Sequence, residues 1–255
     1  MEYIKRGVEP TLLKDNKIKW TKSWVDFYEE KKDKDGGLIK DKKPNDSHWL
    51  NDKVRFALIL TFKNNCGYCG CSRPTPRRET DSKISPRGHV DHYRAKAIHP
   101  RLTYEWTNYI WSCESCNTEK GEFDNPEYPI LNPCDLKDCN QLEFIIDTGE
   151  YCLANNQKPY DLRFKNTDIS TMLNAKEISV QRRNRVKTFK SFFNTISTLL
   201  KVGQNKLCEP LINQHIRSIK DDLEDHNFYF LIQKEQKLLR EKYPEVTRLL
   251  ECNGI

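Results

Sequence analysis

The apolar residues of this chain form short runs in its first half and long helical stripes in its second half. One stripe in the first half predicts a helix that leads into a cysteine motif. Residues 88–92 and 109–112 suit two short paired strands, and residues 117–120 suit the start of a helix. Metal ligands would face the gap between these two strands and the helix. The arrangement predicts a ββα-metal unit. The stripe consists of Val54, Ala57, Leu58 and Thr61.

The pattern changes after Pro126. Residues 142–146 and 151–153 flank a polar turn at 147–150 and predict a hairpin. Helical periodicity dominates from Ile169 onward and predicts three helices, whose apolar stripes are most simply core and in part a surface for a partner. The stripes are Ile178, Val186, Phe189, Phe193, Ile196 and Leu200; then Ile212, Ile216, Ile219 and Leu223; then Phe228, Leu231, Ile232, Leu238 and Leu239, ending before Pro244.

The first fifty residues are polar and are expected to be irregular, with an exposed loop at residues 31–37. The chain has 255 residues, enough for a substantial core in one or two domains. It contains ten cysteines, but its start has no apolar signal-peptide core and no apolar run reaches membrane-spanning length. We therefore expect a cytoplasmic protein whose thiols bind metal rather than form disulfides.

The net charge of +6 does not by itself indicate a nucleic-acid partner. Its distribution is more informative, because residues 72–101 contain eight basic and three acidic residues. We predict that this segment contacts phosphates, with a solvated loop as the alternative. The basic residues are Arg73, Arg77, Arg78, Lys83, Arg87, Arg94, Lys96 and Arg101, and the acidic ones are Glu79, Asp81 and Asp91.

Two Cys-x-x-Cys knuckles bracket this basic segment. Each knuckle can present two thiolates to one ion from a tight turn, and two knuckles complete the tetrahedral shell that zinc favours. We predict a structural zinc on Cys66, Cys69, Cys113 and Cys116. Cys71 competes with Cys69 as a ligand, and Cys134 with Cys139 is a weaker second candidate site. The six cysteines outside the predicted site are expected to be ordinary thiols, namely Cys71, Cys134, Cys139, Cys152, Cys208 and Cys252.

An Asp-His pair lies between the knuckles. Hydrolysis of a phosphodiester needs a divalent ion on the phosphate and a base for the attacking water. Asp91 is a hard oxygen ligand for Mg²⁺ or Mn²⁺, and His92 titrates near neutrality, as a general base should. Neighbours on a strand point to opposite faces, so an ion and a water must span that divergence.

Three further residues complete the candidate site. Asn117 offers another oxygen ligand, Asn108 suits a role in fixing the loop between the strands, and Lys120 can meet a phosphate one turn after Asn117. Taken singly, an Asp-His pair or a turn asparagine carries little information. His89 and His99 are expected at the surface or in support of the site.

With these motifs the chain resembles the HNH endonuclease superfamily in its zinc-knuckle form. The resemblance covers roughly residues 66–133 and implies that His92 is the general base, with Asn108 and Asn117 at the other two signature positions. It also implies that Asp91 and Asn117 hold one Mg²⁺-type ion. The matching motifs are Cys66-x-x-Cys69, Val90-Asp91-His92, Trp106-Thr107-Asn108 and Cys113-x-x-Cys116-Asn117-x-x-Lys120-Gly121.

A narrower resemblance, on weaker motifs, extends over most of the chain. It is to the HNH proteins encoded beside ATPases in bacterial defence, namely the PtuB component of Septu and related retron-associated nucleases. It implies an anti-phage role with a PtuA-like ATPase. The chain departs from the pattern at Ala95, where such proteins usually have proline, and in a long loop at residues 72–87. The matching segments are residues 1–10, 92–96, 104–106, 130–133 and 173–174.

Together these observations predict an α+β protein with three parts. Residues 1–50 form an N-terminal extension, 51–135 the HNH core with its zinc knuckles, and 136–255 a hairpin followed by a mainly helical region. The leading hypothesis is a metal-dependent endonuclease that cleaves DNA, with RNA left open, beside an ATPase. The alternatives are a non-catalytic zinc-containing nucleic-acid-binding module and an adaptor that works through its C-terminal helices. Arg94, Lys96 and Lys120 are the expected phosphate contacts.

Overall fold

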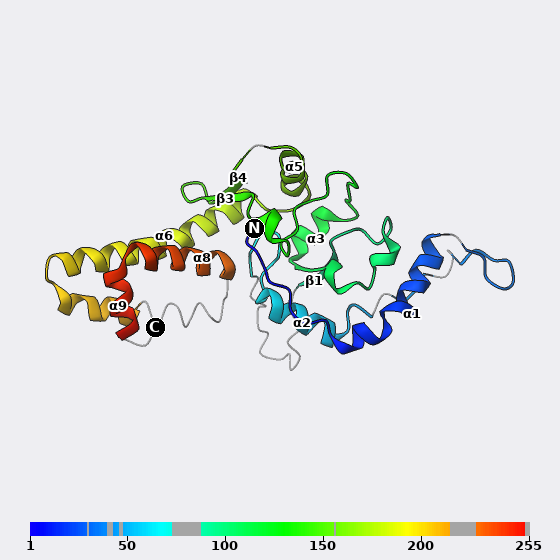
Figure 1. Ribbon diagram of the computed structural model, residues 1–255, viewed down its shortest axis with the longest axis horizontal. Coiled ribbons are helices and arrows are strands. Elements are labelled where there is room, and N and C mark those ends of the chain that lie inside the picture. The colour runs from blue at the N-terminus through cyan, green and yellow to red at the C-terminus, as the bar shows by residue number, and fades with distance from the viewer. Residues whose placement is uncertain are drawn as a thin grey trace.

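A computed structural model describes residues 1–29, 31–39, 43–45, 48–72, 88–155, 157–214 and 228–252. Over these ranges the chain is α+β, as predicted, with two small sheets among helices. The strands β1 and β2 and helix α3 lie centrally, α1 extends to one side, and α6, α8 and α9 extend to the other (Figure 1). The basic loop at residues 73–87, with the five basic residues Arg73, Arg77, Arg78, Lys83 and Arg87, lies outside the described residues.

The N-terminal part contains a long helix, α1 (Thr11–Tyr28), so the prediction of an irregular extension was wrong there. The helix was missed because only Leu13, Trp24 and Val25 are buried along its 18 residues, which leaves almost no apolar stripe to detect. Trp24 packs against the ring of Trp49, with centroids 5.5 Å apart. This aromatic contact ties α1 to the centre of the molecule.

The central unit follows the predicted order. Strands β1 (His89–His92) and β2 (Tyr109–Ser112) pair antiparallel, with Asp91 opposite Ile110. Helix α2 (Asp52–Phe62) precedes them and buries Val54, Leu58 and Phe62. Helix α3 (Glu114–Lys120) begins earlier than predicted, because the Cys113 sulfur accepts a hydrogen bond from the Cys116 N–H and caps the helix. Short 3-10 turns, η2 (Pro100–Leu102) and η3 (Trp106–Asn108), lie in the connection between the strands.

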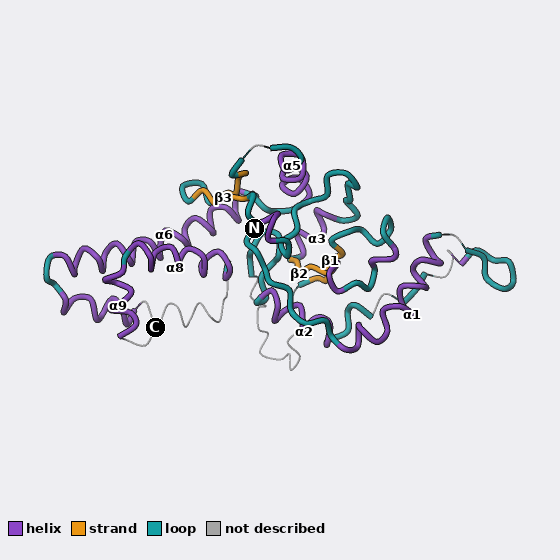
Figure 2. The backbone as a smooth tube through the Cα atoms, in the orientation of Figure 1, coloured by secondary structure: helices purple, strands orange, loops and turns teal. Residues whose placement is uncertain are grey.

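The second sheet is the predicted hairpin, which is separate from the first (Figure 2). Of the predicted helices, the first and third are confirmed as α6 and α8, whereas Ile216, Ile219 and Leu223 of the second lie outside the described residues. Pro244 ends one helix and begins another, a position at which proline needs no N–H donor. The elements are α4 (Leu136–Cys139), β3 (Leu142–Ile145), β4 (Glu150–Leu153), α5 (Tyr160–Ser170), α6 (Lys176–Lys201), η4 (Asn205–Leu207), α8 (Tyr229–Lys242) and α9 (Pro244–Cys252).

Arg182 of α6 joins the helical region to the first knuckle. Its guanidinium is buried and donates to the carbonyl oxygens of Cys69, Leu173 and Gly149, at 3.0, 2.8 and 2.6 Å. The aromatic rings of Tyr151 and Phe228 lie 4.7 and 5.7 Å from its central carbon. One hydrophobic core therefore runs from the N-terminal residues through the knuckles to α9.

Candidate functional site

The four predicted zinc ligands meet in one buried cluster. The sulfurs of Cys66, Cys69, Cys113 and Cys116 all lie within 4.8 Å of one another, which suits a single tetrahedral metal ion. Hydrogen bonds, foremost from the Cys116 thiol and next from that of Cys66, lower the pKa of Cys113. A thiolate is thereby favoured, and thiolates are the form that binds zinc.

The other cysteines near the cluster, or proposed for a second site, do not share its geometry. Cys71 lies 3.2 Å from the Cys69 sulfur but falls outside the set of four. In the described part of the chain no second cluster of ligands forms around Cys134 and Cys139. The Met172 N–H donates to the Cys116 sulfur at 3.4 Å, so the segment before α6 covers the second knuckle.

Asp91 is buried, and its carboxylate contacts one residue of the first knuckle and one residue of helix α3. The Tyr68 hydroxyl donates to Asp91 Oδ2 at 2.5 Å, and Lys120 Nζ lies 3.2 Å from Asp91 Oδ1. Lys120 Nζ also donates to the carbonyl oxygen of His92 at 2.7 Å. Lys120, predicted to meet a phosphate, is itself buried, with a side-chain exposure of 0%. In this arrangement its ammonium neutralises Asp91 instead of facing solvent.

His92 occupies an aromatic pocket on the other side of β1. Its ring meets those of Trp49 and Tyr109 edge-on, and its Nε2 lies 2.9 Å from the carbonyl oxygen of Thr103. Since a carbonyl only accepts, Nε2 must carry the proton and Nδ1 is the basic nitrogen. Burial lowers the pKa of His92 to about 4. The imidazole is therefore neutral at physiological pH, and the prediction that His92 titrates near neutrality was wrong, because burial makes it a weaker base than a free histidine.

Asn108 fixes the loop between the two strands, as predicted. Its Oδ1 accepts from the Arg94 N–H at 2.8 Å, and its Nδ2 donates to the carbonyl oxygens of Arg94 and Leu102, both at 3.1 Å. Asn117 lies on α3, one turn before Lys120, and is half-buried. Among the described residues its side chain has no hydrogen-bond partner, so its oxygen is free to accept a ligand.

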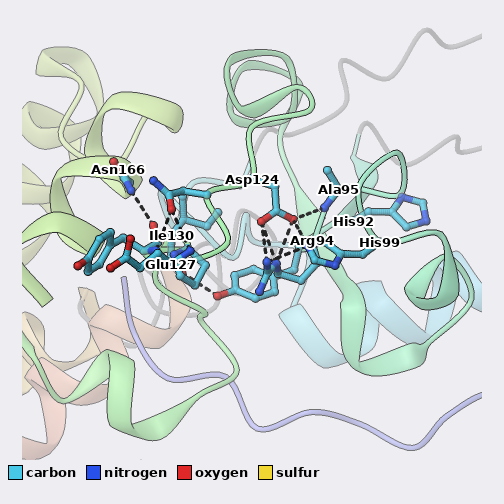
Figure 3. A network of polar contacts seen from close by, with 12 residues as sticks. His92, Arg94, Ala95, His99, Asp124, Glu127, Ile130 and Asn166 are labelled. Carbon is cyan, nitrogen blue, oxygen red and sulfur yellow. Dashed lines mark hydrogen bonds and ion pairs between the residues drawn. The ribbon is translucent and has the colours of Figure 1, made fainter. Parts of the chain in front are cut away.

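Asp124 organises the residues that follow the Asp-His pair (Figure 3). Its buried carboxylate accepts from Arg94 Nε at 2.9 Å and from the Ala95 N–H at 2.8 Å. His99 Nε2 lies 3.3 Å from the same group, whereas His89 is exposed. Arg94 is thus held in an ion pair, with a side-chain exposure of 22%.

The departure at Ala95 has a structural reason. The Ala95 N–H is one of the donors to Asp124 Oδ2, and proline has no N–H to offer. Lys96, another predicted phosphate contact, is half-buried with its ammonium 5.8 Å from the Trp24 ring. The cations nearest the Asp-His pair therefore have partners within the protein.

Two site residues escaped sequence analysis. Tyr68 gave a faint signal, because it lies inside the first Cys-x-x-Cys motif. Asp124 gave none, since an isolated aspartate in a polar loop is unremarkable and its partners lie about thirty positions away.

The chain is similar in sequence to a curated bacterial protein. It is 30% identical to the Septu protein PtuB of Bacillus thuringiensis over 159 residues, which are 62% of this chain. The same match covers 55% of PtuB, so it spans little more than half of that protein. No protein-family model matches the chain. No helix in the described ranges combines the length and apolar character needed to cross a bilayer.

Proposed function

We propose that this protein is a metal-dependent HNH-type endonuclease that cleaves nucleic acid, DNA in the first instance, in anti-phage defence. The observation that carries the proposal is the buried Asp91–His92 pair, which lies between the two knuckles in the sequence and contacts Tyr68 of the first knuckle. Strand β1 sends the carboxylate toward the knuckles and the neutral imidazole toward the opposite face. The PtuB likeness supports the defence role.

The donor set fits the two metals that the proposal requires. Four clustered sulfurs suit a structural zinc. One carboxylate, Asp91, and one amide oxygen, Asn117, suit Mg²⁺ or Mn²⁺, which is commonly held by few protein ligands and several waters. Both Asp91 oxygens already accept hydrogen bonds, yet each keeps a further lone pair. When bound, such an ion polarises a phosphate oxygen and stabilises the charge that develops on it.

His92 is the proposed general base. Its Nε2–H is fixed by the Thr103 carbonyl, which leaves Nδ1 as the atom that takes the proton of the attacking water. Asn108 holds the backbone of Arg94 and so keeps the turn after His92 in place. Arg94 and Lys96 remain proposed phosphate contacts, for which they would exchange or share their present partners.

The test is cleavage of labelled DNA and RNA by the purified protein with Mg²⁺ or Mn²⁺, alone and with its neighbouring ATPase. We expect His92→Ala to lose roughly a hundred- to ten-thousand-fold in cleavage rate, the range for a general base. His89→Ala, at an exposed histidine on the same strand, is the matched control and should cleave normally. Normal cleavage by His92→Ala would rule out His92 as the base.

One observation favours a second candidate function. His92 and Asp91 are only 8% and 5% exposed, and Asp91 already has a cationic partner. A non-catalytic zinc-containing module that binds nucleic acid, or an adaptor, would need no more than this. Binding without cleavage, in the presence of the partner and either ion, would favour that candidate.

The proposed partner is a PtuA-like ATPase in the cytoplasm. The sequence contains no phosphate-binding Gly-rich loop with Lys-Ser/Thr, so ATP hydrolysis is assigned to another chain. An open groove between the β3–β4 hairpin and α8 offers a surface for it, with Leu238 exposed beside Phe144 and Ile146. Copurification of wild-type protein and Leu238→Lys with the ATPase tests this surface, and equal recovery would exclude it.

A further inference from the structure

Each knuckle supplies one group to the buried carboxylate of Asp91. Tyr68 lies between the two cysteines of the first knuckle and is fully buried, with its hydroxyl on Asp91 Oδ2. Lys120 lies at the end of α3, the helix that Cys113 caps and that contains Cys116. Its ammonium reaches Asp91 Oδ1. The cysteine cluster therefore determines where both partners of Asp91 stand.

The two partners differ in charge, and this difference decides how each acts on a cation at Asp91. The Tyr68 hydroxyl is an uncharged group that donates its hydrogen bond to Asp91 Oδ2. A neutral donor fixes the orientation of a carboxylate while leaving its other lone pairs for a metal ion. The Lys120 ammonium is a cation in a water-poor site, and it repels any second cation there.

We propose that Tyr68 and Lys120 are positioning residues with opposite effects on the divalent ion at Asp91. Tyr68 orients the carboxylate for the ion, and Lys120 is a resident cation that the ion must displace or repel. This inference rests on the proposed function, because it takes Asp91 as the ion's ligand. A buried lysine is costly to desolvate, but its charge here offsets that of Asp91, which without it or an ion would be a buried charge with no countercharge.

Direct measurement of Mn²⁺ binding tests the proposal without any activity assay. Free Mn²⁺ is titrated by electron paramagnetic resonance against the zinc-loaded full-length protein, and the Mn²⁺-induced rise in Tm is recorded in parallel. We expect Tyr68→Phe to weaken Mn²⁺ binding by about ten- to a hundredfold, the usual cost of losing a group that orients a ligand. We expect Lys120→Met to tighten it by about tenfold or more, with a larger rise in Tm.

Controls separate this from a general loss of structure. Tyr109→Phe removes another buried hydroxyl, one that donates to the Thr103 carbonyl and not to Asp91, and should bind Mn²⁺ like wild type. Lys120→Gln removes the charge but keeps a donor for the His92 carbonyl, so it serves if Lys120→Met fails to fold. Bound zinc is measured in every variant, and only variants with one zinc per chain are compared.

The outcomes are distinguishable. If the wild-type protein binds no Mn²⁺, or if its Mn²⁺ binding survives Asp91→Asn, the ion site of the proposed function and this inference both fail. If wild type binds Mn²⁺ at Asp91 but both variants bind as wild type does, only the inference fails. If Lys120→Met and Lys120→Gln weaken binding as Tyr68→Phe does, Lys120 is merely structural and the opposed roles are overturned.

Discussion

The surroundings of His92 determine both which of its ring nitrogens carries the proton and the direction in which its pKa is shifted. The Thr103 carbonyl fixes one nitrogen, and the rings of Trp49 and Tyr109 remove water from the imidazole. The nearby carboxylate of Asp91 raises the pKa of His92, but burial lowers it more strongly. The residue therefore stays neutral well into the acidic range, and its basic nitrogen is available at any pH at which the protein is expected to work.

This shift predicts a specific dependence of stability on pH. The folded pKa of about 4 lies below the ordinary 6.5. Between these values the unfolded chain binds a proton at His92 that the folded chain does not, so the free energy of unfolding falls as pH falls through that window. The loss at pH 4.5 is about 2 to 3 kcal/mol. Urea unfolding of wild type and His92→Gln at pH 7 and pH 4.5 measures it, and equal pH dependence in the two proteins would contradict the assignment.

At the scale of elements, the two knuckles are local structures whose four sulfurs together could hold one metal ion. Helix α3 begins at Cys113, and its far end carries Lys120 to Asp91. Losing one ligand should therefore disturb α3 and, with it, the environment of Asp91.

We predict that Cys113→Ser abolishes stoichiometric zinc and lowers Tm substantially, because structural zinc contributes folding free energy directly. Zinc content by atomic absorption and thermal unfolding monitored by circular dichroism measure both effects. Cys152→Ser, at a half-buried cysteine of the hairpin, is the control and should keep one zinc per chain. A full zinc complement in Cys113→Ser would mean that Cys71 or another thiol can complete the site.

Sequence analysis found the elements whose signals are local. The knuckles, β1, β2, the hairpin, α6 and α8 follow from spacing and periodicity within short windows. It missed α1 and α5, which bury few residues, and α9, which follows directly on α8 at Pro244. It assigned Lys120 to a phosphate contact and did not find its partner, Asp91, because the two are 29 positions apart and only the packing of α3 on β1 brings them together.

At the scale of the whole molecule, the boundary predicted at residue 135 lies between two regions that share one hydrophobic core. Arg182 donates to the Cys69 carbonyl, and the Phe228 N–H donates to that of Gly70. Both contacts fall on the first knuckle. We therefore expect the helical region to stabilise the knuckle as well as to provide a surface.

Arg182→Met tests this coupling. The substitution leaves three carbonyl groups without their donor in a buried site, and such losses cost about 1 to 3 kcal/mol for each unsatisfied group. We expect one cooperative transition at lower denaturant concentration, reported equally by zinc release and by helix content. Arg183→Met, its more exposed neighbour, is the control. Zinc retained through the helical transition would show that the two regions unfold separately.

The place of Arg182 has a consequence for the order in which the protein is made. All four cysteines of the cluster leave the ribosome before residue 182 does, so the sulfurs can come together before α6 is synthesised. Until α6 arrives, the Cys69 carbonyl faces water, and until Phe228 arrives, so does that of Gly70. The nascent chain can thus acquire its metal early, but the knuckle reaches its final, enclosed state only near the end of translation.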